Sequence, residues 1–155
     1  MALPEIGQDA PDFELPSDGG GTIALSSLKG KTVVLYFYPK DDTSGCTTEA
    51  VDFSTLKPDF EKAGATVVGI SPDSAKSHDK FKAKHGLSVA LAADEAKNTL
   101  EAYGVWVEKS MYGKKYMGVE RTTILVGPDG KVRKVWPKVK VPGHAKDVLE
   151  AVKSL

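Results

Sequence analysis

Apolar and polar residues alternate along the chain in blocks that predict strands and helices in turn. The segment from Thr32 to Tyr38 is β-branched and aromatic with little polarity, which is typical of a buried central strand. The segment from Ala65 to Ile70 repeats that pattern. Between them, apolar residues recur every three or four positions from Gly45 to Leu56, which predicts a helix. Because Pro58 cannot sit inside a regular helix, we expect it to begin a second short helix over Pro58 to Lys62.

The second half of the chain continues this alternation. Ser74 is a suitable N-cap and Gly86 a suitable C-cap for the charged segment between them. The tight turn over residues 127–130 predicts a hairpin. The remaining expected elements are an edge strand over 12–15, a surface turn over 19–21, a helix over 75–85, a strand over 89–92, a helix over 97–103, strands over 121–126 and 131–136, and a helix over 144–153.

The order of these elements indicates an α/β fold. Crossover helices join parallel strands, whereas a hairpin adds antiparallel ones. We therefore expect one domain over residues 1–155, built as a three-layer α/β/α sandwich with a mixed central sheet. Ligands of such folds bind outside the carboxyl ends of the central strands. The loop over residues 39–45 follows the central strand, so the chemistry is expected there.

Composition excludes several classes of protein. The chain has 155 residues, and its 21 Lys and Arg balance 21 Asp and Glu, which argues against a nucleic-acid binder. Its longest apolar run is far too short to span a membrane. The three histidines His78, His85 and His144 lack metal-ligand spacing, so we expect solvated surface side chains and no metal.

Cysteine usage narrows the picture further. The only cysteine, Cys46, permits neither an intramolecular disulfide nor a cysteine-rich metal site. A lone thiol suits a reducing compartment, and the N-terminal residues carry no signal-peptide pattern, so we expect a cytoplasmic protein. Cys46 stands where the loop meets the following helix, whose unpaired N–H groups and partial positive charge favour a thiolate. The alternative is a small buried apolar side chain.

The residues around Cys46 carry a resemblance to a known family. Pro39, Thr43 and Cys46 fit the spacing P-x-x-x-T-x-x-C within the stretch Tyr36 to Glu49. This stretch resembles the peroxiredoxins, and specifically their bacterioferritin-comigratory or Q-type subgroup. The resemblance extends over nearly the whole chain and includes Arg121 at the start of a later strand. It implies a thioredoxin-like fold and a thiol-dependent peroxidase that reduces hydrogen peroxide and organic hydroperoxides through a peroxidatic cysteine.

The resemblance also implies a role for each site residue. Cys46 attacks the peroxide O–O bond and becomes a sulfenic acid, and no cofactor is needed because the cysteine carries the electrons. The Thr43 hydroxyl bridges the sulfur and the attacked oxygen, and Arg121 stabilises the charge as it shifts. Backbone N–H groups near Gly45 donate to the oxygens, while Pro39 shields the thiol from water.

One further residue, and three departures from the family pattern, affect these expectations. Glu49 is expected to orient Arg121, although a carboxylate near a helix N-terminus is also favoured by the helix dipole alone. Val51 stands where the subgroup often has a second cysteine, and residues 75–85 offer no replacement. The resolving cysteine is therefore absent, and an external thiol must close the cycle: thioredoxin, or glutaredoxin with glutathione. Ser44 replaces a common proline and is expected to loosen the loop.

Three other functions stay open at this point. The same oxidation of Cys46 could serve a redox sensor that does not turn over. A thioredoxin-like disulfide reductase usually needs C-x-x-C, but Thr43 stands where its other cysteine would be. A purely structural role predicts an inert thiol. The expected partners are a peroxide and a thiol reductant, with no nucleic acid and no membrane, and we expect a monomer, with a weak dimer as the alternative.

Overall fold

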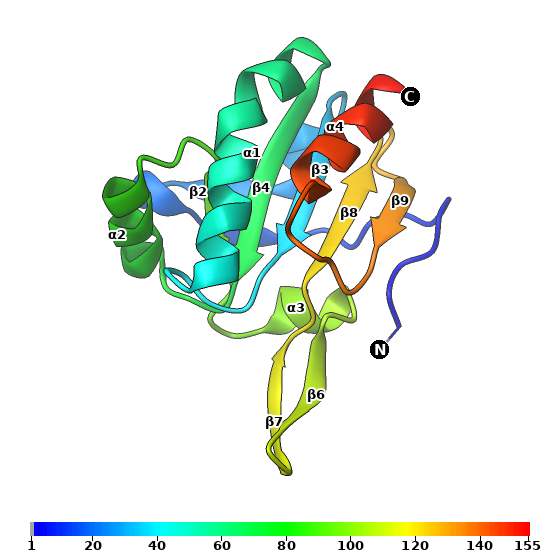
Figure 1. Cartoon of the computed structure of the whole chain (residues 1–155). Helices are drawn as coiled ribbons and strands as arrows, with labels where there is room; N and C mark the ends of the chain where they lie inside the picture. The colour runs from blue at the N-terminus through cyan, green and yellow to red at the C-terminus, as the bar shows by residue number, and fades with distance from the viewer. Residues whose placement is uncertain (1) are drawn as a thin grey trace.

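A five-stranded mixed sheet forms the centre of the computed structural model, which describes residues 2–155 (Figure 1). Its strand order is β5-β4-β3-β8-β9. The first three strands in that order are parallel, and β8 and β9 are antiparallel to their neighbours. The expected mixed sheet is therefore confirmed. Its strands are β3 (Thr32–Phe37), β4 (Ala65–Ser71), β5 (Ala90–Ala93), β8 (Thr122–Val126) and β9 (Val132–Trp136).

Alternate side chains of strand β3 point to opposite faces of the sheet, and all of them are buried because both faces are covered. Val34 and Tyr36 pack against the apolar residues of two helices, whereas Leu35 and Phe37 face the N-terminal segments and a short third helix. These two packed faces make the three layers that the sequence predicts. The helices of the first face are α1 (Ser44–Lys62) and α4 (His144–Lys153). The second face is covered by β1 (Glu14–Pro16), β2 (Thr22–Ala24) and α3 (Asn98–Ala102), with the 3-10 turns Asp18–Gly20 and Leu25–Leu28 nearby.

Helix α1 runs without interruption through Pro58, so the predicted break into two helices is wrong. A proline inside a helix has no N–H to donate to the carbonyl four residues earlier, here that of Ser54. The Ser88 hydroxyl donates to this Ser54 carbonyl oxygen at 3.3 Å. The Ser54 hydroxyl in turn accepts the backbone N–H of Ser88 at 3.0 Å. The first bond satisfies the carbonyl that Pro58 leaves free, and the two bonds together hold α1 to the segment before β5.

Helix α2 (Ala75–His85) has the ends that the sequence predicts. The Ser74 hydroxyl accepts the backbone N–H of Ser77 at 3.1 Å, which is an N-cap bond. Gly86 has a φ of 62° at the other end, a left-handed conformation that glycine adopts without strain. The helix lies beside β5 at one edge of the sheet (Figure 1).

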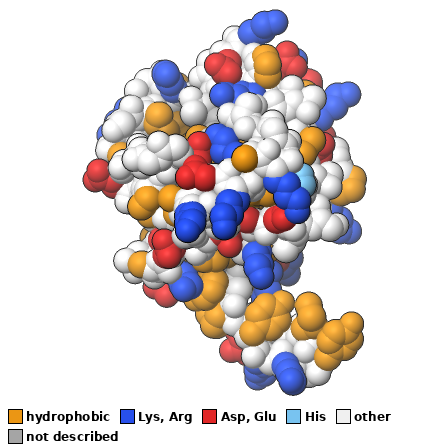
Figure 2. Space-filling model, turned by 90° about the vertical axis from the view of Figure 1, so that its left-hand side faces the viewer, with side chains coloured by type: hydrophobic (Ala, Val, Ile, Leu, Met, Phe, Trp, Pro, Cys, Tyr) orange, Lys and Arg blue, Asp and Glu red, His pale blue; other side chains and the backbone are white. Residues whose placement is uncertain are grey.

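A hairpin of β6 (Trp106–Met111) and β7 (Lys114–Val119) was not predicted from the sequence. It projects from the body below α3 (Figure 1). Apolar side chains gather on its projecting part (Figure 2), where Tyr112 is 97% exposed. Lysine interrupts the apolar positions of both strands, and a glutamate does so in β6, which hides the usual pattern of alternation. The hairpin leads directly into Glu120 and Arg121, so it delivers the chain to the end of the sheet where β3 stops.

Candidate active site

Cys46 lies in the first turn of α1, at the carboxyl end of β3. Thr43 is the N-cap, and its carbonyl oxygen accepts the backbone N–H of Thr47 at 2.8 Å. The N–H groups of the first turn have no acceptor within the helix, and the helix dipole places partial positive charge around them. The thiol is 1% exposed. A buried sulfur at such a helix start has nearby donors for a negative charge.

Arg121 reaches the sulfur from the position directly before the neighbouring strand β8. Because β8 pairs antiparallel with β3, with Thr122 opposite Phe37, the residue before β8 comes to lie beside the end of β3. The Nη2 atom of Arg121 donates to Cys46 Sγ at 3.2 Å. Its Nη1 atom donates to Glu49 Oε1 at 2.6 Å. One planar guanidinium thus bridges the thiol and a carboxylate, an arrangement that the single ammonium of lysine cannot reproduce.

Glu49 is buried one helical turn beyond Cys46, with 1% of its surface exposed. Its Oε1 atom binds Arg121, whereas Oε2 has no hydrogen-bond partner among residues 2–155. Burial raises the pKa of Glu49 to about 7, against the opposing effect of the Arg121 charge. This carboxyl group therefore titrates near neutral pH, and the negative charge that faces Arg121 is present only when Glu49 is ionised.

Gly45 contributes through its lack of a side chain. A Cβ atom built at Gly45 would lie 3.3 Å from Nη2 of Arg121, the nitrogen that contacts the sulfur. Any larger residue would therefore press on the guanidinium at its contact with Cys46. The family resemblance gives Gly45 only a backbone N–H donor, and nothing in the local sequence indicates this steric requirement.

Comparison with known proteins agrees with this geometry. The sequence pattern of the AhpC/TSA family matches residues 6–135. A putative peroxiredoxin bcp of Coxiella burnetii is 52% identical over 145 residues, which cover 94% of this chain and 96% of that protein. The chain belongs to the peroxiredoxin family. Peroxiredoxin Bcp of Bacillus subtilis is 49% identical over 151 residues, covering 97% of this chain and 96% of that one.

Solved peroxiredoxin structures share the fold over nearly the whole chain. A peroxiredoxin Q of Xanthomonas campestris superposes with a TM-score of 0.90 at 47% identity, covering 99% of this chain and 97% of that one. A Xylella fastidiosa PrxQ mutant reaches a TM-score of 0.93 at 41% identity, covering 97% and 96% of the two chains. The expected resemblance to Q-type peroxiredoxins is confirmed, as is the thioredoxin-like sandwich.

Two other expected site residues of this peroxiredoxin lie in the loop before α1. The hydroxyl of Thr43 donates to the backbone carbonyl of Lys40 at 2.9 Å, a bond within the loop. No hydrogen bond joins Thr43 to Cys46 among residues 2–155. Pro39 directly follows the buried Tyr38 and is itself half-buried. The structure thus gathers Cys46, Arg121 and Glu49 in direct contact and leaves these two residues beside them.

The expectation of surface histidines is wrong at two of the three positions. His78 is fully buried on α2, where it contacts the carboxylate of Asp41 at 2.8 Å. His144 is buried with Nε2 at 2.7 Å from the Thr123 hydroxyl, and burial lowers its pKa to about 4. His85 is half-buried and contacts Asp42 at 2.7 Å. Polar partners distant in sequence allow these rings to leave water.

The part of the chain that the structure describes shows neither a metal-binding cluster nor a membrane-spanning helix. Within residues 2–155, no group of three or more His, Cys, Asp or Glu side chains is arranged to hold a metal ion. None of the helices in that range combines the length and the apolarity that a bilayer crossing needs.

Proposed function

We propose that this peroxiredoxin is a thiol-dependent peroxidase in which Cys46 reduces hydrogen peroxide and organic hydroperoxides. The observation that carries the proposal is the contact of Arg121 with both Cys46 Sγ, at 3.2 Å, and Glu49 Oε1, at 2.6 Å. A fixed cation at the sulfur favours the thiolate, which is the nucleophilic form of cysteine. The family gives further support, because a related Xanthomonas campestris bacterioferritin comigratory protein is described by its alkyl peroxide reduction activity.

In the proposed reaction, the Cys46 thiolate attacks one peroxide oxygen in line with the O–O bond. A sulfur–oxygen bond forms, the O–O bond breaks, and both electrons of that bond leave with the departing oxygen. The departing oxygen takes up a proton and becomes water or an alcohol, and Cys46 is left as a sulfenic acid. Negative charge moves from sulfur to oxygen during this step, so fixed donors around both atoms lower the barrier.

Each neighbouring residue has a proposed part in that step. Arg121 keeps its charge beside the sulfur throughout, and Glu49 fixes the orientation of the guanidinium. Thr43 is proposed to turn its hydroxyl toward the sulfur and the attacked oxygen when peroxide is bound. The unpaired backbone N–H groups near Gly45 donate to the peroxide oxygens, and Pro39 limits the access of water.

An external thiol completes the proposed cycle. Cys46 is the only cysteine in the chain, so its sulfenic acid has no internal thiol with which to condense. Thioredoxin, or glutaredoxin with glutathione, is the proposed donor, and it forms an intermolecular disulfide that a second thiol releases. A cytoplasmic location is proposed, since its reducing conditions supply such thiols and suit an unpaired cysteine. We propose a monomer as the working form.

The test is steady peroxide consumption with each thiol donor, compared between the unsubstituted chain and Cys46→Ser. Serine is not ionised near neutral pH, so the variant should retain the fold by circular dichroism and lose all turnover. Peroxide consumption by Cys46→Ser would refute the proposal. A single oxidation without turnover would instead indicate the redox sensor, and reduction of insulin disulfides would indicate the disulfide reductase.

A further inference from the structure

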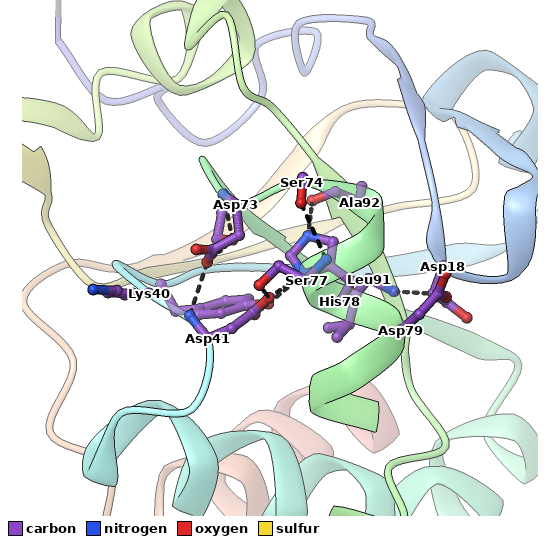
Figure 3. Close-up of polar contacts among 12 residues, drawn as sticks. Asp18, Lys40, Asp41, Asp73, Ser74, Ser77, His78, Asp79, Leu91 and Ala92 are labelled. Atoms are coloured by element: carbon purple, nitrogen blue, oxygen red, sulfur yellow. Dashed lines mark hydrogen bonds and ion pairs between the residues drawn. The ribbon is translucent and has the colours of Figure 1, made fainter. Parts of the chain in front are cut away.

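The loop that leads to Cys46 is fastened to α2 through one buried carboxylate. Asp41 is only 8% exposed although it lies in a loop. Its Oδ1 atom accepts the Tyr38 hydroxyl at 2.6 Å, and its Oδ2 atom accepts the Ser77 hydroxyl at 2.7 Å. His78 Nδ1 lies 2.8 Å from the same Oδ2 atom (Figure 3). Three groups, one from the residue directly after β3 and two from α2, therefore converge on this side chain.

The backbone of Asp41 is held at the same place. Its N–H donates to Asp73 Oδ2 at 2.8 Å (Figure 3). The same Asp73 oxygen also accepts the Ser71 hydroxyl at 2.7 Å. Ser71 ends β4, and Asp73 lies in the turn before α2. Both the side chain and the main chain of Asp41 are thus bound, which fixes the position of the loop two residues before Thr43, the N-cap of α1.

His78 meets a hydrogen-bond acceptor at each ring nitrogen. Nδ1 faces the Asp41 carboxylate at 2.8 Å, and Nε2 faces the backbone carbonyl oxygen of Ala92 on β5 at 3.0 Å. A carbonyl oxygen and a carboxylate oxygen only accept, so both nitrogens must carry a proton for both bonds to form. A neutral ring has one proton, and either tautomer then loses one of the two bonds. The geometry therefore points to a charged imidazolium.

The surroundings of the ring agree with that charge. Asp41 and Asp73 supply negative charge from the loop and from the turn before α2, and the Tyr38 hydroxyl faces the ring from the position directly after β3. Burial alone would lower the pKa of His78, but the hydrogen bond and the charge of Asp41 outweigh it and raise that pKa above its usual value. The ion pair is therefore present below this raised pKa and is lost as the pH rises through it.

We propose that protonated His78 is a positioning residue for Cys46, acting through Asp41 to fix the loop from which α1 begins. This inference rests on the peroxidase function proposed above. Without the His78 proton, one hydrogen bond to Asp41 or to Ala92 is lost, and the loop loosens. Peroxide attack is sensitive to such a change, because misplacement of a reacting group by about 1 Å can slow a reaction roughly a hundredfold.

The proposal gives two reactions of Cys46 opposite responses to alkaline pH. Oxidation by peroxide needs the positioned loop, so its rate should fall when His78 loses its proton. Alkylation by iodoacetamide needs only an accessible thiolate, and Cys46 is 1% exposed while the loop is held. Its rate should therefore rise more steeply than the thiolate fraction. Loss of thiolate would lower both rates together.

The first measurement uses the unsubstituted chain. Nitrogen-detected NMR of the histidine rings between about pH 6 and about pH 10 should show both His78 nitrogens protonated at neutral pH, and should give the pH at which one proton leaves. Quenched-flow oxidation and alkylation of Cys46 are followed over the same range. Because Cys46 is the only thiol in the chain, the remaining free thiol measures both reactions directly.

Two variants separate the charge of the pair from its packing. In Asp41→Asn the amide N–H can donate to Nδ1 of a neutral His78, whose Nε2 proton stays on the Ala92 carbonyl. This variant should keep its oxidation rate through the alkaline range. In His78→Phe both hydrogen bonds are lost, and oxidation at neutral pH should slow roughly tenfold or more. Lys80→Gln is the matched control, since Lys80 is an exposed cation on the same helix.

The outcomes decide the proposal independently of the variants' stability. A neutral His78 ring at pH 7 overturns it, as does an alkaline loss of oxidation rate that persists unchanged in Asp41→Asn. A wild-type oxidation rate in a folded His78→Phe also overturns it. If no chain reacts with peroxide, the proposed peroxidase function fails. In that case the alkylation profile and the NMR titration still show whether His78 positions Cys46.

Discussion

Replacement of Arg121 by alanine removes the guanidinium that bridges Cys46 and Glu49. Two effects on peroxide oxidation follow, and they depend differently on pH. An ordinary thiol is only about 3% ionised at pH 7, so loss of thiolate stabilisation slows the reaction at most about 30-fold there. That factor disappears at high pH, where every thiol is ionised.

The second effect of Arg121→Ala acts on the transition state and persists at every pH. Loss of one fixed donor to the developing charge typically raises the barrier by about 2.7–4 kcal/mol, which is roughly 10²–10³ in rate. Because Nη2 lies 3.2 Å from the sulfur and within the buried site, its contribution should fall in this range. At neutral pH the total loss should therefore exceed the 30-fold that ionisation alone can cause.

Quenched-flow oxidation of Cys46 by hydrogen peroxide, measured from neutral to strongly alkaline pH, separates the two effects. We expect a rate deficit of roughly 10²–10³ for Arg121→Ala that remains after the thiol is fully ionised. The matched control is Arg133→Ala, because Arg133 lies on β9 with 45% of its side chain exposed. Complete recovery of the Arg121→Ala rate at high pH would refute the reasoning and leave Arg121 a role in ionisation only.

Three further predictions concern Glu49, Thr43 and the oxidised cysteine. Folded Glu49 keeps its proton to about pH 7, against a usual pKa of 4.5, so the contribution of Glu49 to the unfolding free energy should fall by about 3 kcal/mol as the pH rises across that interval. Urea unfolding across this interval should therefore show the unfolding free energy of Glu49→Gln rising by this amount relative to that of the wild type. If the unfolding free energies of the two chains instead run parallel against pH, the raised pKa of Glu49 is contradicted. Thr43→Val should oxidise more slowly than Thr43→Ser in quenched flow, since only serine keeps the hydroxyl, and equal rates would remove that hydroxyl from the reaction. Excess peroxide without reductant should give an intact mass two oxygens above the thiol, and a stable sulfenic acid would show that the site excludes a second peroxide.

The central sheet could be predicted because its signal is local. The continuous apolar run from Val33 to Phe37 indicates by itself a strand buried on both faces, and the caps at Ser74 and Gly86 each depend on a few adjacent residues. The uninterrupted α1 could not be predicted, because the group that satisfies the carbonyl left free by Pro58 comes from Ser88, thirty residues later. Local patterns cannot report a partner at that distance.

The candidate site likewise has some residues that a local motif predicts and other features that depend on distant parts of the chain. The spacing from Pro39 to Cys46 and the family resemblance identify Cys46, Thr43 and Arg121, but a motif does not describe the shape between residues. The clearance that Gly45 gives to Arg121 depends on the pairing of β3 with β8, and the burial of His78 depends on an aspartate 37 positions away. A histidine on a charged helix is typical of a solvated face until that carboxylate is located.

The absence of a second cysteine agrees with how firmly the two helices are held. Val51 is 39% exposed on α1, away from the buried Cys46, so a thiol there could meet Cys46 only after the helix unwinds. Helix α2, the other place considered for a resolving cysteine, is fastened to the loop by Ser77 and His78. In this chain neither helix has to open to form an internal disulfide. The polar contacts that hold the loop can therefore persist through the whole peroxide step, and opening is needed only when an external thiol must reach the sulfenic acid.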